Sequence, residues 1–367
     1  MKYIWQRENW PSFEYDASGI QGVLLRFSEK TGRVDGLLSA LPDSLQTESI
    51  VDLMVAEALK SSEIEGEMLS RPDVMSSIRN NLGLNAQPKK IGDRRAEGIA
   101  KLMVCVRKHC ASPLTQNMLH EWHSMLMMGA PQVKSGGWRT HSEPMQIVSG
   151  TIGDEVVHYE APPSKQVPAE MRRFTKWFND TGPASKNEIA SPPLRSALAH
   201  LYFESIHPYE DGNGRIGRVL SEKALSQGLG RPVLLSLSRS IEMDRSGYYQ
   251  ALKQAQQSDD ATKWIEWFVR MLLKAQEQAE QEIEFALMKT KLFDRVGSQL
   301  NERQLKVIRR MLKEGPDGFV GGMTAKKYVS ITGTSKPTAT RDLQDLVAKR
   351  VLIPVGGGRS SRYLLEL

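Results

Sequence analysis

One glycine-rich segment, His207–Arg218 (HPYEDGNGRIGR), most narrows what this chain can fold into. Its twelve residues combine a histidine, acidic residues, three glycines, an asparagine and two arginines, which suits a loop and a helix start rather than a hydrophobic core. Glycines let backbone N–H groups converge on an anion, and a helix N-terminus adds about half a positive charge. The segment therefore predicts a polyphosphate site beside a base, and an enzyme that acts on a nucleotide.

Single residues of this segment suit different parts of such a site. Arg215 and Arg218 are three residues apart, so they share a helix face and can each bind a phosphate. Asp211 suits Mg²⁺, which prefers one or two carboxylates together with phosphate oxygens. His207 lies a few residues before the expected anion site and is placed to deprotonate an attacking hydroxyl, a role worth roughly 10²–10⁴-fold in rate.

Two other patterns lead away from an active site. Gly212–Gly217 matches the dinucleotide fingerprint GxGxxG, but that fingerprint needs a preceding strand and a parallel βαβ unit. Here the preceding residues have helical period, so we set a dinucleotide fold aside. His120 and His123 lie three apart on one expected helix and lack a third metal ligand nearby, which favours packing against the core.

Helical period dominates the first 300 residues. We expect a partly irregular cap with one short helix over residues 1–43. The expected helices after the cap run from about Thr47 to Gly66, Arg94–Cys110, Thr115–Met128, Pro168–Asp180, Pro193–Ile206, Arg215 to Gly228 and Trp264 to about Val296. Two β-branched runs, Met145–Ser149 and Glu155–Tyr159, flank a glycine-containing turn and predict a hairpin, which Trp138-Arg139 is expected to help anchor.

The glycine-rich segment resembles the signature of the Fic family, HxFx(D/E)GNGRxxR, with Tyr209 in place of the usual phenylalanine. The tyrosine keeps an aromatic ring that would pack beneath the loop. The resemblance covers about residues 50–275, since Met145–Pro163 has the position of the family's hairpin flap and Tyr248-Tyr249 matches a pair beyond the signature. It implies a mainly α fold, an all-helical Fic core with a β-hairpin flap.

The resemblance also implies an activity, the transfer of AMP from ATP to a Ser, Thr or Tyr hydroxyl of a target protein or of the chain itself. ATP is then the substrate and Mg²⁺ the cofactor, with His207 as the base and Asp211 as the metal ligand. Gly214 separates this chain from kinase-like relatives, which have lysine near this point. The implied nucleotide contacts are Asp211, Gly212, Asn213, Gly214, Arg215 (β-phosphate), Gly217, Arg218 (γ-phosphate), Tyr248 (adenine) and Gln256. The implied flap contacts, which bind the target by strand addition, are Val157, His158, Tyr159 and Glu160.

Ser61–Gly66 (SSEIEG) resembles the family's inhibitory pattern, (S/T)xxxE(G/N). Ser61 and Glu65 are four residues apart and share one helix face. The resemblance implies that Glu65 pairs with Arg218, which deprives the γ-phosphate of its partner and misaims the α-phosphate. A charge-assisted pair of this kind is worth roughly 1.5–3 kcal/mol. The plain alternative is an exposed glutamate at a helix end.

The last 67 residues carry the net positive charge of the chain. Residues 301–367 contain 13 Lys/Arg and 6 Asp/Glu, whereas residues 1–300 contain 36 and 37. Helical periods at 301–314, Thr324–Thr332 and from Ser335, followed by Val351–Val355 and Tyr363–Leu365, resemble a winged helix-turn-helix domain. That resemblance implies DNA contacts by Lys336, Thr338, Thr340, Arg341, Arg359 and Arg362. The alternative is a tail that binds protein or only packs on the enzyme.

We therefore expect five segments. They are an N-terminal cap (1–45), a helical region with the inhibitory helix (46–111), the catalytic core (112–275), a connector helix (276–300) and the winged helix (301–367). The chain contains no run of about 18 apolar residues and no signal-peptide core at its start, so we expect no membrane span. Cys105 and Cys110 are its only cysteines, which favours a cytoplasmic setting without disulfides.

Three further possibilities stay open from the sequence. A nucleotide-sensing, DNA-binding transcriptional regulator with weak or no transfer activity would use the same phosphate site without the base. An enzyme that removes AMP from a modified protein would share the whole site. A homodimer is equally compatible with these patterns.

Overall fold

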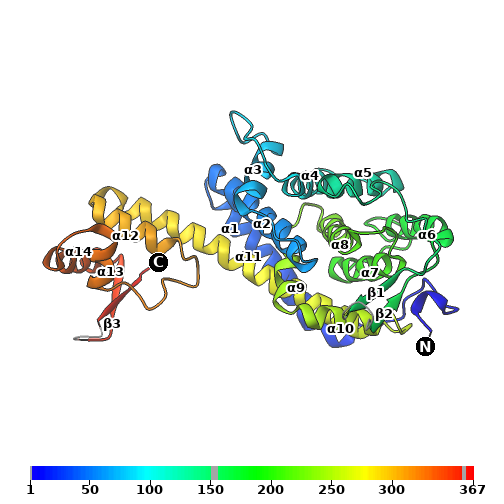
Figure 1. The fold of residues 1–367 in the computed structure, drawn as a ribbon. Coiled ribbons are helices and arrows are strands. Elements are labelled where there is room, and N and C mark those ends of the chain that lie inside the picture. Colours follow the sequence, from blue (N-terminus) through cyan, green and yellow to red (C-terminus); the bar gives the residue numbers. More distant parts are fainter. Residues whose placement is uncertain (1, 150–155, 358–360) are drawn as a thin grey trace. The chain divides into compact units, whose positions relative to one another are not determined.

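The computed structural model describes residues 2–149, 156–357 and 361–367 and is mainly helical, which confirms the predicted fold class. Its described residues form two compact units (Figure 1). The first unit contains the chain up to Gly32 together with Ile50–Glu277, and the second contains Arg33–Ser49 and Gln278–Leu367. The boundaries of the five expected segments stay a prediction.

The predicted helices are confirmed to within a few residues at most ends. The α-helices that lie wholly in the first unit are α3 (Arg71–Asn81), α4 (Arg94–Lys108), α5 (Gln116–Leu126), α6 (Val167–Asp180), α7 (Pro192–Ile206), α8 (Asn213–Leu229), α9 (Leu237–Met243) and α10 (Arg245–Ala255). The helices with residues in both units are α1 (Gln21–Ser39), α2 (Asp43–Ile64) and α11 (Thr262–Val296). Short 3-10 helices occupy Ile4–Gln6, Ser18–Ile20, Met127–Gly129, Ser164–Gln166 and Gly297–Gln299. None of the described helices is both long enough and apolar enough to cross a membrane.

The expected short helix of the N-terminal cap is wrong in length, because α1 has 19 residues. Its three glycines disfavour a long helix, since a glycine costs roughly 1 kcal/mol in a helix interior. The burial of Phe27 and Val34, seven residues apart on one face, outweighs that cost. Tertiary packing thus extends a helix that its local sequence disfavours.

Helices α7 and α8 form the centre of the first unit and lie side by side (Figure 1). Every residue of α7 from Pro193 to Ile206 is buried, so this stretch of the helix has no face exposed to solvent. Its Tyr202 ring packs at right angles to the Phe174 ring of α6, with the ring centroids 5.1 Å apart. This rigid pair holds both ends of the glycine-rich loop, which connects the C-terminus of α7 to the N-terminus of α8.

The predicted hairpin is confirmed as the antiparallel strands β1 (Gln146–Ser149) and β2 (Val156–Glu160). The turn that we expected between them falls on residues outside the described ranges. Arg139, which is buried, donates from Nε to the His207 carbonyl at 2.8 Å and from Nη1 to Ser164 Oγ at 2.9 Å, and also contacts the Pro162 carbonyl. It therefore ties the segment after the hairpin to the end of α7, as predicted.

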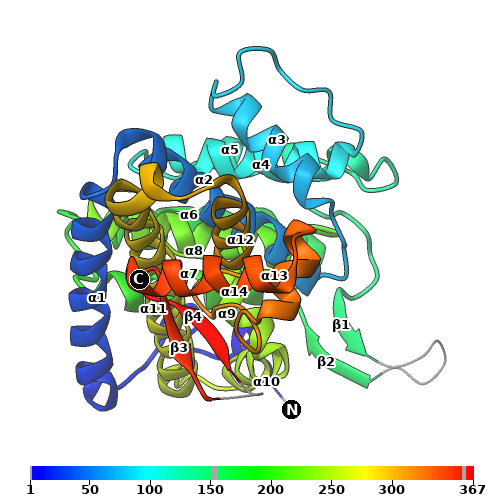
Figure 2. The same cartoon turned by 90° about the vertical axis from the view of Figure 1, so that its left-hand side faces the viewer.

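The second unit contains the expected elements of the tail. They are α12 (Glu302–Leu312), α13 (Ala325–Thr332), α14 (Lys336–Ala348), β3 (Leu352–Val355) and β4 (Arg362–Leu365), with β3 and β4 antiparallel (Figure 2). Asp342 on α14 is buried and accepts hydrogen bonds from Arg303 of α12 at 2.9 Å and from the Tyr328 hydroxyl of α13 at 2.9 Å. This network fixes the three helices against one another, and their identity as a winged helix stays a prediction.

Candidate active site

The loop after α7 is held in shape by its own side chains. His207 ends α7 in the left-handed region (φ 49°), and Gly212 takes the same region (φ 80°) just before α8, where glycine is favoured. The Asn213 amide accepts from Tyr209 N at 2.9 Å and donates to Tyr209 O at 2.9 Å. The side chain of Asn213 is therefore occupied within the loop, so its backbone N–H is the group left for the phosphate contact we expected.

An aromatic pair supports the loop from below, as the sequence predicted for Tyr209. The Tyr209 ring is fully buried and stacks on His123 at 3.9 Å and 7°. His123 Nδ1 accepts from Gly136 N at 3.0 Å, so Nε2 carries the proton and donates to Asp211 O at 3.1 Å. Burial lowers the pKa of His123 to about 4, so the ring is neutral at pH 7. Its predicted packing role is confirmed, and the described residues contain no cluster of three potential metal ligands.

His207 lies against a buried carboxylate that the sequence analysis missed. Its Nδ1 lies 3.5 Å from Glu204 Oε2, and the two side chains are 14% and 4% exposed. Burial opposes ionisation of Glu204, but His207 and the nearby charges of His200 and Arg218 hold the pKa of Glu204 below its usual value. The ionised Glu204 favours the tautomer with a proton on His207 Nδ1, which leaves Nε2 as the basic atom. Their i, i+3 spacing at the end of α7 was the signal.

The second arginine of the signature is held by the end of α2. Arg218 is 1% exposed; its Nε donates to Ser61 Oγ at 2.9 Å, and its Nη2 donates to Ser61 O and to Glu65 Oε1, both at 2.8 Å. Although burial acts in the opposite direction, the charge of Glu65 raises the pKa of Arg218. A Cβ atom at Gly214 would lie 2.2 Å from Glu65 Oε1. The carboxylate of Glu65 therefore lies directly over the glycine that was expected to line the phosphate site.

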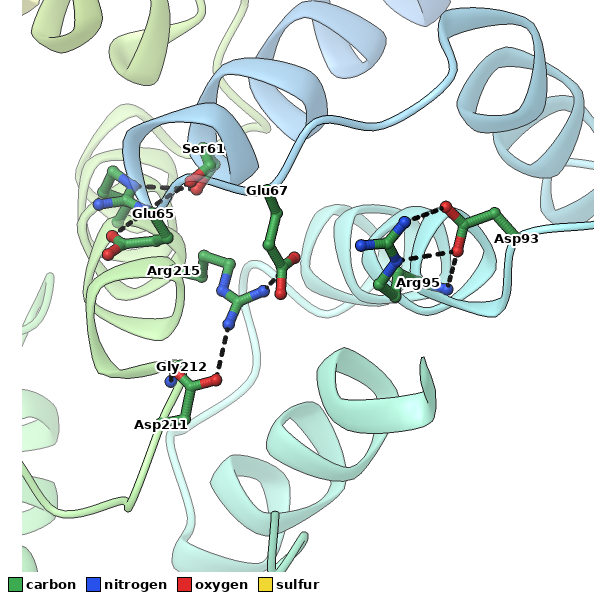
Figure 3. A network of polar contacts seen from close by, with 9 residues as sticks. Ser61, Glu65, Glu67, Asp93, Arg95, Asp211, Gly212 and Arg215 are labelled. Atoms are coloured by element: carbon green, nitrogen blue, oxygen red, sulfur yellow. Dashed lines mark hydrogen bonds and ion pairs between the residues drawn. The ribbon is translucent and has the colours of Figure 1, made fainter. Parts of the chain in front are cut away.

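The first arginine is held by a second glutamate, Glu67, which sequence reasoning also missed. Arg215 Nη1 donates to Glu67 Oε2 at 2.6 Å, and Nη2 lies 3.4 Å from Asp211 Oδ2. Figure 3 shows the Arg215 guanidinium between these two carboxylates. Arg215 is 3% exposed, whereas half of the Asp211 side chain is exposed. The repeated glutamate in the Glu65–Glu67 sequence (EGE) was the available signal.

Tyr248, expected to line an adenine pocket, lies in the core instead. It is 2% exposed, and its hydroxyl lies 2.8 Å from His200 Nε2. The ring of Trp264 on α11 packs 6.2 Å from it, and that burial accounts for the difference from the expected pocket position. The neighbouring Tyr249 is 40% exposed, so it is the ring of this pair that is open to a ligand.

Two further expected nucleotide contacts serve helix packing. A Cβ atom at Gly217 would lie 2.4 Å from Glu204 Oε1, so this glycine allows α8 to approach α7. Gln256 is 2% exposed, and its side chain donates to Glu204 O at 3.2 Å. Both residues face the helix end that carries His207 and do not form an open surface for ATP.

The flap residues have different environments. Val157 is 40% exposed, and His158 Nδ1 lies 3.2 Å from Lys253 Nζ. Tyr159 is buried and donates to Ser205 O at 2.6 Å, which pins β2 to α7 and removes this side chain from any direct target contact. Glu160 accepts from Gln146 across the hairpin at 2.9 Å. Strand addition at this flap therefore depends on its backbone rather than on Tyr159.

The candidate DNA contacts in the tail are only partly open. Lys336, Arg341 and Arg362 are exposed. Thr338 and Thr340 are half-buried, and the Thr340 hydroxyl donates to Lys336 O at 3.0 Å. Arg359 lies outside the described residues.

Comparison with curated proteins finds relatives of part of the chain. The protein adenylyltransferase Fic of Nematostella vectensis is 29% identical over 138 residues, which are 38% of this chain and 29% of that protein. The protein of the same name from Drosophila melanogaster is 33% identical over 108 residues, 29% of this chain and 19% of that protein. The matched region therefore spans less than a third of the length of these relatives.

Solved structures share the fold. A Fic family protein from Desulfovibrio desulfuricans has a TM-score of 0.56 at 21% identity, over 97% of this chain and 98% of that one. Fic-1 from C. elegans has a TM-score of 0.51 at 19% identity, over 74% of each chain. Residues 3–84 match a domain of unknown function (DUF4172), and residues 113–225 match the Fic/DOC family. The part of the chain that carries His207, the glycine-rich loop and both arginines therefore lies within the region that matches the Fic/DOC family.

Proposed function

We propose that this protein transfers AMP from ATP to a hydroxyl group of a target protein or of itself. The observation that carries the proposal is the juxtaposition of His207 at the end of α7 with the Gly212–Gly214 amides and two buried arginines at the start of α8. The names of the Nematostella and Drosophila relatives support the same reaction class.

The chain's own residues account for each part of the reaction. His207 Nε2 accepts the proton of the attacking hydroxyl, while Glu204 holds the proton on Nδ1. The hydroxyl oxygen forms a bond to the α-phosphorus, and the bond from that phosphorus to the oxygen bridging to the β-phosphate breaks. Pyrophosphate leaves with both electrons of that bond. The amides at the start of α8 and Arg215 stabilise its developing charge, with Arg218 on the terminal phosphate.

The residues at the loop fit a magnesium ion shared with phosphate. Asp211 accepts from Gly212 N at 2.6 Å through Oδ1 and is half exposed, so a hard oxygen ligand faces the phosphate site. Because the described residues contain no three-ligand cluster, Asp211 would hold the ion together with oxygens of ATP. When bound, Mg²⁺ neutralises charge on the leaving pyrophosphate.

The resting chain is inhibited in this proposal. Ser61 and Glu65 occupy Arg218, and Glu67 occupies Arg215, so neither arginine is available to a phosphate. Each charge-assisted contact is worth roughly 1.5–3 kcal/mol, which ATP or a regulator can overcome. The tail would bring the enzyme to DNA, a role supported by its net charge and by the exposed Lys336 and Arg341 on α14.

Intact-mass measurement after incubation with ATP and Mg²⁺ tests the proposed reaction. We expect the Glu65→Gly variant to gain the mass of one or more AMP groups, and Glu65→Gly with His207→Ala to gain none. A gain of phosphate-sized mass would identify a kinase-like reaction instead. ATP binding without any change in mass would favour the nucleotide-sensing regulator.

A further inference from the structure

The N-terminal segment Tyr3–Arg7 packs on the flap, about 150 residues away in sequence (Figure 1 shows the N-terminus beside β2). The Trp5 indole N–H donates to the Glu160 carbonyl at 2.7 Å. The Tyr3 ring meets the buried Tyr159 ring edge-on at 5.1 Å. This segment belongs to the region that matches a domain of unknown function, so its contacts with the flap offer a role for it.

Trp5 binds the edge of β2 that faces away from β1. Ala161 N donates to Met145 O at 2.9 Å, and these residues are directly opposite each other, so they form a hydrogen-bonded pair. In an antiparallel ladder the next pair, Gln146 and Glu160, does not exchange backbone hydrogen bonds, and its N–H and C=O groups point outward. The Glu160 carbonyl therefore lies on the outer edge of the hairpin, and the Trp5 indole occupies it.

The same N-terminal segment is tied to the helix end that carries the base. Ile4 N donates to Gln256 O at 2.8 Å, and the Gln256 side chain donates to Glu204 O at 3.2 Å. Arg7 adds a bond to Gln257 O at 2.5 Å. The segment that carries Trp5 therefore contacts both the outer edge of β2 and Gln256, whose side chain binds the end of α7 beside His207.

We propose that Trp5 is a positioning residue that sets the register of the acceptor segment, an inference that rests on the proposed function. The acceptor in question is an extended peptide that bears a Ser, Thr or Tyr hydroxyl and adds as a strand to the outer edge of β2. Because Trp5 already occupies the Glu160 carbonyl, the added strand ends before that residue. The hydroxyl of the acceptor peptide is thereby placed at a fixed distance from His207 along the outer edge of β2.

Trp10 supplies a matched control. Its indole N–H also donates one hydrogen bond to an oxygen atom. The acceptor is Glu170 Oε2 on α6, at 2.9 Å, and not an atom of the flap. Replacing either tryptophan with phenylalanine keeps an aromatic ring and removes one indole hydrogen bond. A purely structural role would give the two variants the same phenotype.

The experiment uses the full chain with Glu65→Gly, ATP and Mg²⁺. The probes are pairs of synthetic peptides in which one threonine is moved by two residues, the repeat of a strand, within an otherwise identical sequence. AMP on peptide and AMP released to water are measured together. For each pair we take the ratio of AMP incorporated into the preferred peptide to AMP incorporated into the other peptide. We expect Trp5→Phe to reduce this ratio by about fivefold, which corresponds to the free energy of one hydrogen bond. The KM for ATP and the release of AMP to water should stay unchanged, and Trp10→Phe should keep the parent ratio.

Two different results would overturn parts of this picture. An unchanged ratio in Trp5→Phe, or an equal change in Trp10→Phe, rejects the role of Trp5 while the transfer reaction stands. Absence of AMP on the chain itself, on every peptide and in solution with Glu65→Gly rejects the proposed function and this inference with it.

Discussion

Glu67 Oε2 lies 2.6 Å from Arg215 Nη1, and two residues earlier Glu65 Oε1 lies 2.8 Å from Arg218 Nη2. A single turn after α2 thus gives one carboxylate to each arginine of the glycine-rich segment (Figure 3 shows Glu65 and Glu67 beside α8). In the proposed function, these two carboxylates stand where two phosphates of ATP would bind. The proposed inhibition by this turn therefore has two separable parts.

Glu65→Gly and Glu67→Gln should both activate the enzyme, but in different ways. Release of Arg218 by Glu65→Gly removes a contact of roughly 1.5–3 kcal/mol, so AMP incorporation should rise about 10- to 150-fold. Glu67→Gln frees Arg215 and should chiefly lower the KM for ATP, and the double variant should exceed either single variant. Labelled AMP incorporation over a range of ATP concentrations measures both effects.

Glu63 offers a control for these variants. It lies near the same end of α2 but pairs with Lys60, with Nζ and Oε2 2.6 Å apart, and contacts neither arginine. Glu63→Gln should therefore leave AMP incorporation at the level of the parent chain. Equal incorporation by the parent and by Glu65→Gly would show that this turn does not inhibit the enzyme.

Glu204→Gln tests the carboxylate behind the base. The amide keeps the size of the side chain but loses the charge that holds the proton on His207 Nδ1. In a Glu65→Gly background we expect kcat to fall roughly 10- to 100-fold, part of the 10²–10⁴-fold that general base catalysis contributes. The KM for ATP should not change. Steady-state kinetics separate the two constants, and an unaltered kcat would limit Glu204 to packing against Gly217.

The parts of the site that were predicted from sequence are those fixed by local spacing. The loop from His207 to Arg218 and the hairpin depend on motifs or periods within a few tens of residues. The pairing of Glu65 with Arg218 spans 153 residues and was predicted only because Ser61–Gly66 resembles the family's inhibitory pattern. The sequence did not predict the partner of Arg215, because the repeated glutamate in Glu65–Glu67 does not by itself place Glu67 near residue 215, and only the packing of α2 on α8 does so. The burial of Tyr248 likewise depends on α11, and the length of α1 depends on packing that outweighs its glycines.

DNA binding by the tail is expected to depend on α14. Lys336→Ala with Arg341→Ala should weaken binding to duplex DNA. In a plot of the logarithm of the binding constant against the logarithm of the salt concentration, the slope should become shallower by about one for each phosphate that the variant no longer binds. Lys306 and Arg309 on α12 are also exposed, and their replacement by alanine should have little effect. Fluorescence anisotropy from low to high salt measures these constants. If the parent chain does not bind DNA at low salt, the tail has another role.

Glu222 on α8 predicts how stability depends on pH. Burial, and then the charge of Glu57, raise the pKa of Glu222 to about 8, although Arg107 acts in the opposite direction. An unfolded glutamate has a pKa of about 4.3, so between pH 4 and pH 8 the folded chain binds more protons than the unfolded chain. This group therefore favours folding fully at low pH, and its contribution is lost as the pH rises through that window.

Glu222→Gln should remove this dependence, because the amide resembles the protonated acid at every pH. Relative to the parent chain, Tm should rise by a smaller amount at pH 5 and by a larger amount at pH 8, because most of the window between the two pKa values lies between these pH values; roughly 2–4 °C corresponds to 1 kcal/mol. Glu29 on α1 is exposed, and Glu29→Gln should shift Tm equally little at both values. Thermal unfolding followed by circular dichroism at pH 5 and pH 8 provides the comparison. The same change in Tm at both pH values would show that Glu222 is already ionised in the folded chain at pH 5. In that case the difference in stability between Glu222→Gln and the parent chain would not depend on pH.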